Sequence, residues 1–187
     1  MIVVVKKNGI ACIGGDTLIT PELRKTSLED VSNCEKILSV GKTFLGAEGD
    51  ASLPLVLGSY FRKQKKLPSF KSREDIFDEL LKVHTALKDE YFLNSEQEDD
   101  DSFESIGFQM LLANQHGIFG TYFLRSVQEY SRFYAIGEGS DYAMGALEAL
   151  YDRLKTAEEL VQAAIKIAAE FDVNVGVPGK TFTVKIA

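Results

Sequence analysis

Two cysteines, two histidines and one acidic run are the parts of this sequence that most readily suggest chemistry. Cys12 and Cys34 are not spaced as metal ligands, and a disulfide framework normally uses more cysteines. His84 lies on the apolar face of an expected helix and His116 lies in an expected turn, and neither has a partner at metal-binding spacing. We therefore expect free thiols, a histidine in the core or at an interface, an exposed turn histidine, and neither metal nor cofactor.

The acidic run NSEQEDDDSFE, residues 94–104, is the only stretch that could suggest a cation site. A calcium loop needs its oxygen ligands at fixed spacing around a central glycine, and this run has no such glycine. A run of like charge with few apolar residues is typical of a solvated loop. We expect a loop here.

Composition narrows the class of protein. The chain has 187 residues, 45% of them hydrophobic and 26% charged, which is typical of one globular domain over residues 1–187. A net charge of −7 and a pI near 5.0 argue against a nucleic-acid partner, which needs a basic face. No apolar run reaches the roughly 20 residues of a membrane-spanning helix. MIVVV lacks the basic region and cleavage site of a secretory signal, so we expect a cytoplasmic protein with reduced thiols.

The first stretch, MIVVVKKNGIACIGGD, predicts a hairpin that ends at Asp16. Residues 2–6 and 10–14 are apolar and rich in β-branched side chains, and Asn8-Gly9 between them is a strong signal for a type I′ turn. The first residues of most chains are loosely held, whereas this chain begins on a strand. We expect this end of the strand to lie inside the structure.

The remaining elements must position that hairpin. Amphipathic periodicity and caps predict helices at residues 50–66, 72–87, 140–154 and 156–171. Further strands are expected at residues 35–40, 42–49, 105–113, 117–125, 132–137 and 181–187. The order is sheet, two helices, sheet, two helices and a final strand. It predicts an α+β fold, an αββα sandwich of two antiparallel sheets with helices outside.

Four stretches carry a resemblance to a known family. KKNGIACIGGD ends at Asp16, EKILSV contains Lys36, LGAEGDA contains Gly46, and AIGEGSDYAMGALEALYD contains Glu138. In this order they resemble the proteasome β-subunits and the bacterial proteasome-like peptidase HslV, which are N-terminal nucleophile hydrolases. The likeness covers nearly the whole chain and implies the same αββα fold.

The resemblance implies a mechanism. In this family the first residue after processing attacks the peptide carbonyl with its hydroxyl, and its own α-amine is the general base. A lysine, matched here by Lys36, lowers the pKa of the attacking group, and an aspartate, matched by Asp16, orients the lysine. A backbone N–H, matched by Gly46, stabilises the oxyanion.

The nucleophile is where this sequence departs from the family. By the family's spacing from Asp16, it would fall one position before Met1. Met1 has a thioether without a transferable proton, and its removal would expose Ile2, which is no better. Cleavage before Cys12 would remove the first strand and its buried valines, each worth about 1.5–3 kcal/mol. Cys12 shares strand parity with Asp16, but without a paired base we expect it to serve packing.

Two further positions also differ from the family's pattern. The resemblance places Glu138 where the family has a serine near the terminal amine, and Val175 where it has a second serine. Asp172 aligns with an acidic residue of the family's supporting network. We expect Lys36 to face Asp16, with Met1, Glu138 and Asp172 as further members of one cluster. Such a cluster suits structural ion pairs better than a general base.

Three functions remain open at this point. The first is a catalytically silent proteasome/HslV-type subunit that serves assembly or as a scaffold. The second is an active threonine-type endopeptidase or N-terminal nucleophile amidase with an unrecognised nucleophile or processing. The third is a module that binds a small ligand or peptide in the old cleft. The resemblance implies a homo-oligomeric ring or double ring, and an ATPase unfoldase partner by analogy with HslV.

Overall fold

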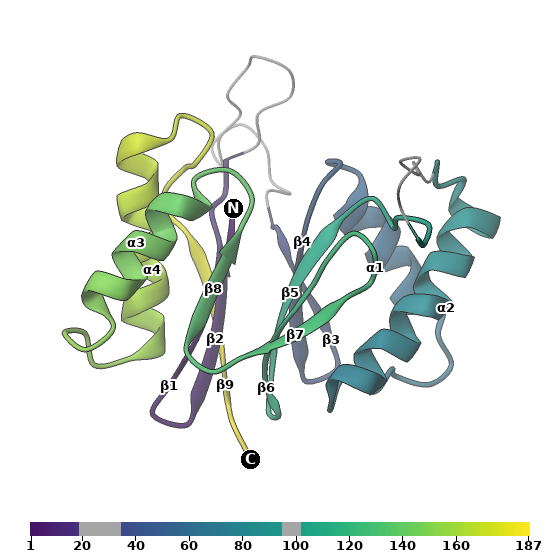
Figure 1. Cartoon of the computed structure of the whole chain (residues 1–187), viewed down its shortest axis with the longest axis horizontal. Coiled ribbons are helices and arrows are strands. Elements are labelled where there is room, and N and C mark those ends of the chain that lie inside the picture. Colours follow the sequence, from purple (N-terminus) through teal and green to yellow (C-terminus); the bar gives the residue numbers. More distant parts are fainter. Residues whose placement is uncertain (19–34, 95–101) are drawn as a thin grey trace.

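A computed structural model describes residues 1–18, 35–94 and 102–187. Two antiparallel sheets pack face to face, with one pair of helices on each outer side (Figure 1). The predicted αββα sandwich is therefore confirmed. Cys34 and most of the acidic run, residues 95–101, lie outside the described residues.

The elements have the following bounds. The strands are β1 (Ile2–Lys7), β2 (Ile10–Gly15), β3 (Ile37–Val40), β4 (Thr43–Glu48), β5 (Gln109–Asn114), β6 (Gly117–Thr121), β7 (Val127–Tyr130), β8 (Phe133–Ile136) and β9 (Lys180–Lys185). The helices are α1 (Leu53–Lys63), α2 (Arg73–Tyr91), α3 (Ser140–Leu150) and α4 (Ala157–Phe171). The strand order is β8-β1-β2-β9 in one sheet and β3-β4-β5-β6-β7 in the other.

The first strand lies inside its sheet, as the sequence predicts. β1 pairs with β2 on one side and with β8 on the other. The turn between β1 and β2 has positive φ at Asn8 (52°) and Gly9 (73°), the geometry that a type I′ turn requires. Strand β9, near the other end of the chain, pairs with β2. This sheet therefore joins both ends of the chain and holds the start of β1 between two neighbours.

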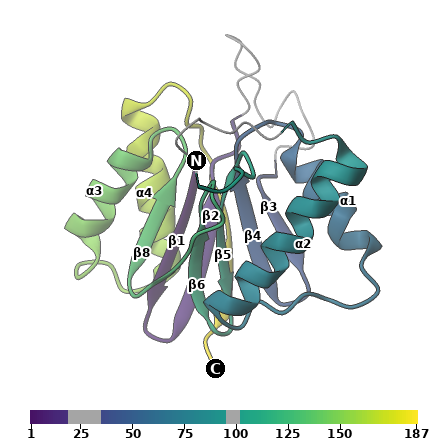
Figure 2. The same ribbon diagram turned by 45° about the vertical axis from the view of Figure 1, so that its right-hand side comes forward.

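Side chains of β1 alternate between two cores because successive residues of a strand point to opposite faces. Val3 and Val5 pack with α3 and α4, and Ile2 and Val4 pack against the other sheet. A third core lies between that other sheet and helices α1 and α2, around Leu57. Figure 2 shows the same layers from a second direction. The start of β1 thus contributes to two of the three hydrophobic cores.

The structure corrects the strand boundaries after residue 104. The strand expected over residues 105–113 begins only at Gln109, and the one expected over 117–125 ends at Thr121. Arg125 has a φ of 63°, so the chain turns there before β7, a strand that we did not expect. Only four residues long and half exposed, β7 gives too short a pattern to detect from sequence.

Helix boundaries also differ: α1 ends at Lys63 and not at residue 66, and α2 continues to Tyr91, beyond residue 87. The first residue of α1 is Leu53 and its N-cap is Ser52, not Asp50 as expected. The Asp50 carboxylate instead accepts a hydrogen bond from the Ser52 N–H at 2.8 Å, so it organises the turn before the helix. Helix α3 ends at Leu150, four residues earlier than 154. Among the described residues, no helix has both the length and the apolar character needed to cross a membrane.

The expected caps of α2 and α4 are present. Ser72 accepts a hydrogen bond from the Asp75 N–H at the start of α2. Thr156 and Glu159 form the complete capping box of α4. Each cap satisfies backbone donors that the first turn leaves without a partner. The cap of α4 helps to fix where that helix begins, and its other end leads into the site described next.

Candidate active site

Asp16 lies at the centre of a buried ion-pair cluster just after the end of β2. Its carboxylate is fully buried, and its Oδ1 accepts from the Met1 ammonium at 2.8 Å and from Lys36 Nζ at 2.7 Å. Lys36 directly precedes β3 of the other sheet, so the cluster joins the two sheets at one end. The structure therefore brings three sequence-predicted residues, Met1, Asp16 and Lys36, together on one oxygen atom.

The second oxygen of Asp16 is held by backbone. Oδ2 accepts from the N–H of Leu18 at 3.1 Å and from the N–H of Gly176 at 3.1 Å. Gly176 follows α4 and was not expected from the sequence. A Cβ on Gly176 would lie 2.5 Å from the Cβ of Leu18, closer than real Cβ atoms approach. The glycine thus lets the chain after α4 approach close enough to donate to Asp16.

The surroundings of the cluster shift the pKa of the Asp16 carboxyl and that of the Met1 amine. Burial raises the pKa of Asp16, but the adjacent Met1 ammonium and Lys36 outweigh it and hold that pKa below its usual value. Burial lowers the pKa of the Met1 amine, and this effect exceeds the opposing attraction of Asp16. The site is therefore a carboxylate held in its charged form beside an amine whose charged form is disfavoured.

The side chain of Met1 points away from the gap between the sheets. It is 6% exposed and packs in the core on the side of α3 and α4, together with Val3 and Val175. Gly137, at a φ of 84°, adjoins the backbone of Met1, because a Cβ there would lie 3.3 Å from the Cα of Met1. The same Cβ would lie 3.0 Å from Cγ of Glu48. The side chain of Glu48 thus passes close to the backbone of Met1, which the sequence did not indicate.

Gly46 lies inside β4, opposite Ile37 of β3 and Leu111 of β5. The tight turn between Val40 and Thr43 makes those two residues a hydrogen-bonded pair, and such pairs alternate with non-bonded ones along an antiparallel ladder. Gly46 and Ile37 therefore form a non-hydrogen-bonded pair, and the Gly46 N–H points to Leu111. The oxyanion role of Gly46 stays a prediction, and it would require this N–H to leave the sheet.

Glu138 and Asp172 do not join the cluster around Lys36. Glu138 is exposed in the turn before α3. Asp172 ends α4, and its Oδ1 accepts from the Asn174 N–H at 2.9 Å. Among the described residues, Lys36 forms its ion pair with Asp16. Asp172 therefore shapes the chain that leads to Gly176 instead of contacting the lysine.

The hydroxyl and the thiol nearest to Asp16 in the sequence are held in other contacts: one in a hydrogen bond and the other in the core. Cys12 is fully buried in the core beside α4, and burial raises the pKa of its thiol to about 12. The Thr17 hydroxyl donates to the Pro178 carbonyl at 2.8 Å. The side chains of His, Cys, Asp and Glu form no group of three or more that could hold a metal ion in the described ranges.

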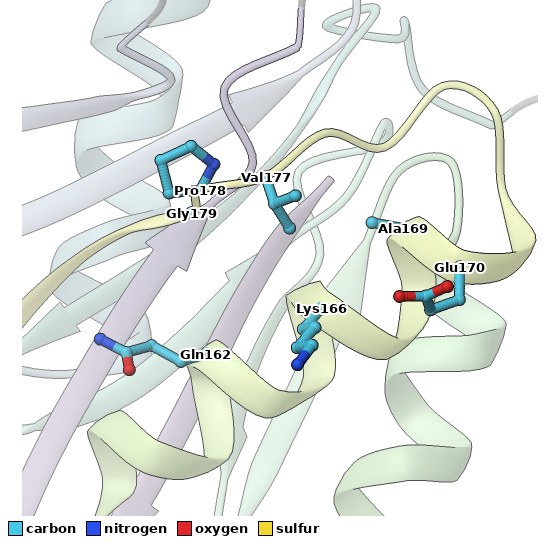
Figure 3. A pocket seen from close by; sticks show the side chains of 7 residues that line it. All are labelled: Gln162, Lys166, Ala169, Glu170, Val177, Pro178 and Gly179. Carbon is cyan, nitrogen blue, oxygen red and sulfur yellow. The ribbon is translucent and has the colours of Figure 1, made fainter.

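A separate groove runs along the outer side of α4 (Figure 3). Gln162, Lys166, Ala169 and Glu170 form one wall, and residues 177–179 form the other. The groove lies behind the loop whose Gly176 holds Asp16. It contains none of the residues of the ion-pair cluster.

Comparison with known proteins places the chain in a family. The family model described as proteasome subunit matches residues 1–187. The chain belongs to the proteasome subunit family. The resemblance carried by the four sequence stretches is thereby confirmed for the whole chain.

Solved structures agree with this family. The Thiobacillus denitrificans protein BPH, solved alone and in complex with epoxomicin, is 36% identical, with a TM-score of 0.93 over 100% of this chain and 98% of that one. Eukaryotic HslV from Trypanosoma brucei has a TM-score of 0.66 at 17% identity, covering 98% of each chain. At that identity HslV supports the shared fold.

Proposed function

We propose that this chain is a proteasome/HslV-type subunit that does not hydrolyse peptide bonds and serves assembly or as a scaffold. The observation that carries the proposal is the position of Met1. Its amine lies 2.8 Å from Asp16 Oδ1, directly before the start of β1, and its side chain is packed in the core. A thioether has no proton to transfer, so Met1 cannot act as an acyl-transfer nucleophile.

Neither nearby candidate replaces it. Cys12 is fully buried, and a thiol with a pKa of about 12 is almost wholly protonated near neutral pH. The Thr17 hydroxyl donates to the Pro178 carbonyl at 2.8 Å. Both side chains are better explained by packing and by the attachment of residues 176–178 to the end of β2.

The cluster has a structural role in this proposal. Two cations on one carboxylate oxygen, with two backbone donors on the other oxygen, attach β1, β2, β3 and the chain after α4 to one another. Buried charges are tolerated when they are paired and hydrogen-bonded. The cluster therefore fixes the end of the sandwich where these segments meet.

The decisive experiment combines three measurements on natively expressed protein. We expect intact mass and N-terminal sequencing to give Met1 as the first residue. We expect no mass increase after incubation with epoxomicin, and no turnover of fluorogenic peptides. A residue with a hydroxyl ahead of Met1, a covalent adduct, or turnover that disappears when a single Thr, Ser or Cys is replaced would overturn the proposal.

The second candidate is an active hydrolase of the same family. It is favoured by the 36% identity to the Thiobacillus protein, whose structure was solved in complex with epoxomicin. In that case the chain would be processed differently in the cell, and the amine next to Asp16 would belong to a first residue other than Met1. The adduct measurement separates the two candidates, because only an active chain would gain the mass of the compound.

We also propose that the subunit forms a homo-oligomeric ring. Proteasome and HslV subunits assemble into oligomeric rings, and this chain shares their family and fold. Sedimentation velocity should give a species much larger than 20.7 kDa. A monomer at all concentrations would remove the assembly part of the proposal. An ATPase unfoldase partner rests on analogy with HslV alone.

A further inference from the structure

Three of the seven tyrosines contact one another where the chain crosses from one sheet to the other. Tyr130 ends β7, Tyr134 lies in β8 of the other sheet, and Tyr122 directly follows β6. Figure 1 shows the chain passing from β7 into β8 at this edge of the sandwich. The rings of Tyr130 and Tyr134 pack against the core between the sheets. We call these three residues the tyrosine cluster.

The rings of the tyrosine cluster are in direct contact. Tyr130 and Tyr134 stack with their centroids 4.4 Å apart and their planes 4° from parallel. Carbon atoms of two rings stacked in this way lie within about 4.5 Å of each other, the range of apolar contact. Tyr122 is edge-on to Tyr134, and its hydroxyl is hydrogen-bonded to that of Tyr130. Gly120 leaves room for this arrangement, because a Cβ there would lie 2.8 Å from the Tyr130 hydroxyl oxygen.

The phenols of the cluster are held in their protonated form. Burial raises the pKa of Tyr130 to about 12. Burial also raises the pKa of Tyr122, and its hydrogen bonds with Tyr130 and Tyr134 raise that pKa further. A protonated phenol that loses an electron becomes strongly acidic and must release its proton. A hydroxyl can accept as well as donate, so the hydrogen bond between Tyr122 and Tyr130 offers a route for that proton.

We propose that the tyrosine cluster is a site of oxidative modification, at which a haem peroxidase acting with hydrogen peroxide couples Tyr130 to Tyr134 as an intramolecular dityrosine. Each phenol gives one electron to the oxidant and its hydroxyl proton to solvent. The two phenoxyl radicals form a bond between one ortho carbon of each ring, and the hydrogens on those carbons move to the two oxygens. The chain therefore loses two hydrogen atoms, and one molecule of hydrogen peroxide becomes two of water.

Proximity favours this pair over coupling between separate chains. Two reacting groups that the fold holds in contact combine at an effective concentration far above that of separate molecules. Tyr142 offers a contrast, because it is 47% exposed and the ring on which it stacks is Phe171, which has no hydroxyl. A radical at Tyr142 would couple with a second chain and give a covalent dimer. The inference does not depend on whether the chain hydrolyses peptides or forms a ring.

Peptide mapping of the full chain tests the site. The protein is treated at low concentration with a haem peroxidase and hydrogen peroxide, and the fluorescence of dityrosine is followed. We expect a monomer in denaturing electrophoresis whose mass is lower by two hydrogen atoms. Trypsin cleaves after Arg132, between the two coupled residues, so residues 126–132 and 133–153 should be released as one linked pair of peptides. Fragmentation of that pair should place the link on Tyr130 and Tyr134.

Conservative variants assign the link to its two residues. Tyr130→Phe and Tyr134→Phe keep the rings and should each abolish the linked peptides, whereas Tyr142→Phe is the matched control and should retain them. Linked peptides that persist in either cluster variant, or dityrosine found in covalent dimers without the linked pair in the monomer, would overturn the proposal. The map of the original protein decides the site even where a variant fails to fold.

Discussion

Two buried charged clusters lie in different halves of this molecule and differ in how well their atoms are satisfied. Around Asp16, both carboxylate oxygens have two donors each, from a terminal amine, a lysine and two backbone N–H groups. On the other side, Arg125 donates to His84 Nδ1 at 2.7 Å, but His84 Nε2 and Arg125 Nε have no hydrogen-bond partner among the described residues. The first cluster is complete and the second is not.

The difference between the two clusters shows that the burial of charged groups is not enough to mark a candidate site. His84 and Arg125 are as deeply buried as many core residues, 7% and 8% exposed. They join α2 to the turn before β7, and they lie outside the four stretches that carry the family resemblance. Asp16 joins four segments, and it is the residue that the sequence resemblance predicts to be the family's aspartate. Burial alone therefore does not distinguish the two clusters, whereas the pairing of their groups does.

The largest expected effect comes from removing the charge of Asp16. Asp16→Asn leaves the Met1 ammonium and Lys36 without their counter-ion, and breaking a buried ion pair in this way costs about 3–5 kcal/mol. We expect the free energy of unfolding, measured with urea, to fall by that amount. The exposed Asp50→Asn keeps its acceptor oxygen and should change it by less than about 0.5 kcal/mol.

The same carboxylate should make the protein sensitive to acid. Because the pKa of Asp16 is lower in the folded than in the unfolded chain, its contribution is present above the usual carboxyl pKa of about 4 and is lost as pH falls below it. Asp16→Asn should lose this part of the acid dependence. If Asp16→Asn had the same stability as the original protein at neutral pH, the ion pairs of Asp16 would not stabilise the fold, and the contrast between the two clusters would fail.

A smaller effect is expected where the chain after α4 approaches β2. Gly176→Ala would place a Cβ 2.5 Å from the Cβ of Leu18, so the segment must shift and its N–H must move away from Asp16. We expect a loss of about 1–3 kcal/mol in the free energy of unfolding. Gly145→Ala in α3 is the matched control, because nothing lies within 4 Å of its added Cβ.

The control should shift in the opposite direction. Alanine in a helix interior is more favourable than glycine by about 0.5–1 kcal/mol, so Gly145→Ala should be neutral or stabilising. If both glycine variants changed stability equally, the approach of Gly176 to Asp16 would not be a constraint on the fold.

The smallest expected effect belongs to the incomplete cluster. Burial and the charges of Arg125 and Lys88 lower the pKa of His84, and Glu104 opposes them. The unfolded chain therefore takes up a proton first, so stability should be fully present above the usual histidine pKa of about 6.5 and should fall as pH drops below it. Melting temperatures from pH 8 to pH 5 measure this dependence.

Two histidine variants separate this effect from others. His84→Gln keeps an acceptor for Arg125 and removes the proton site, so its melting temperature should fall less on acidification. His116→Gln, in the turn between β5 and β6, should keep the dependence of the original protein. Identical pH dependence in the two variants would exclude His84 as its source and leave the second cluster without a measurable role.

Much of the fold could be predicted from the sequence because its signals are local. Asn8-Gly9 fixed the first hairpin through the positive φ values that a type I′ turn needs. The box of Thr156 and Glu159 marked the start of α4. Strand β7 was missed because four half-exposed residues give no clear periodicity. Asp50 was mistaken for a cap because a carboxylate can organise a turn before a helix as well as the helix itself.

The sequence by itself determined which residues were candidates: Asp16 and Lys36 because they resemble positions of the family, and Met1 because it departs from the family's nucleophile. Only the tertiary structure decided that Asp16 is also held by Gly176, 160 residues further along the chain. It also decided that Glu138 stays outside the cluster while Glu48 lies near Met1. Helices and turns follow from contacts between near neighbours, whereas the partners of a buried charge depend on which distant segments pack closely enough to reach it.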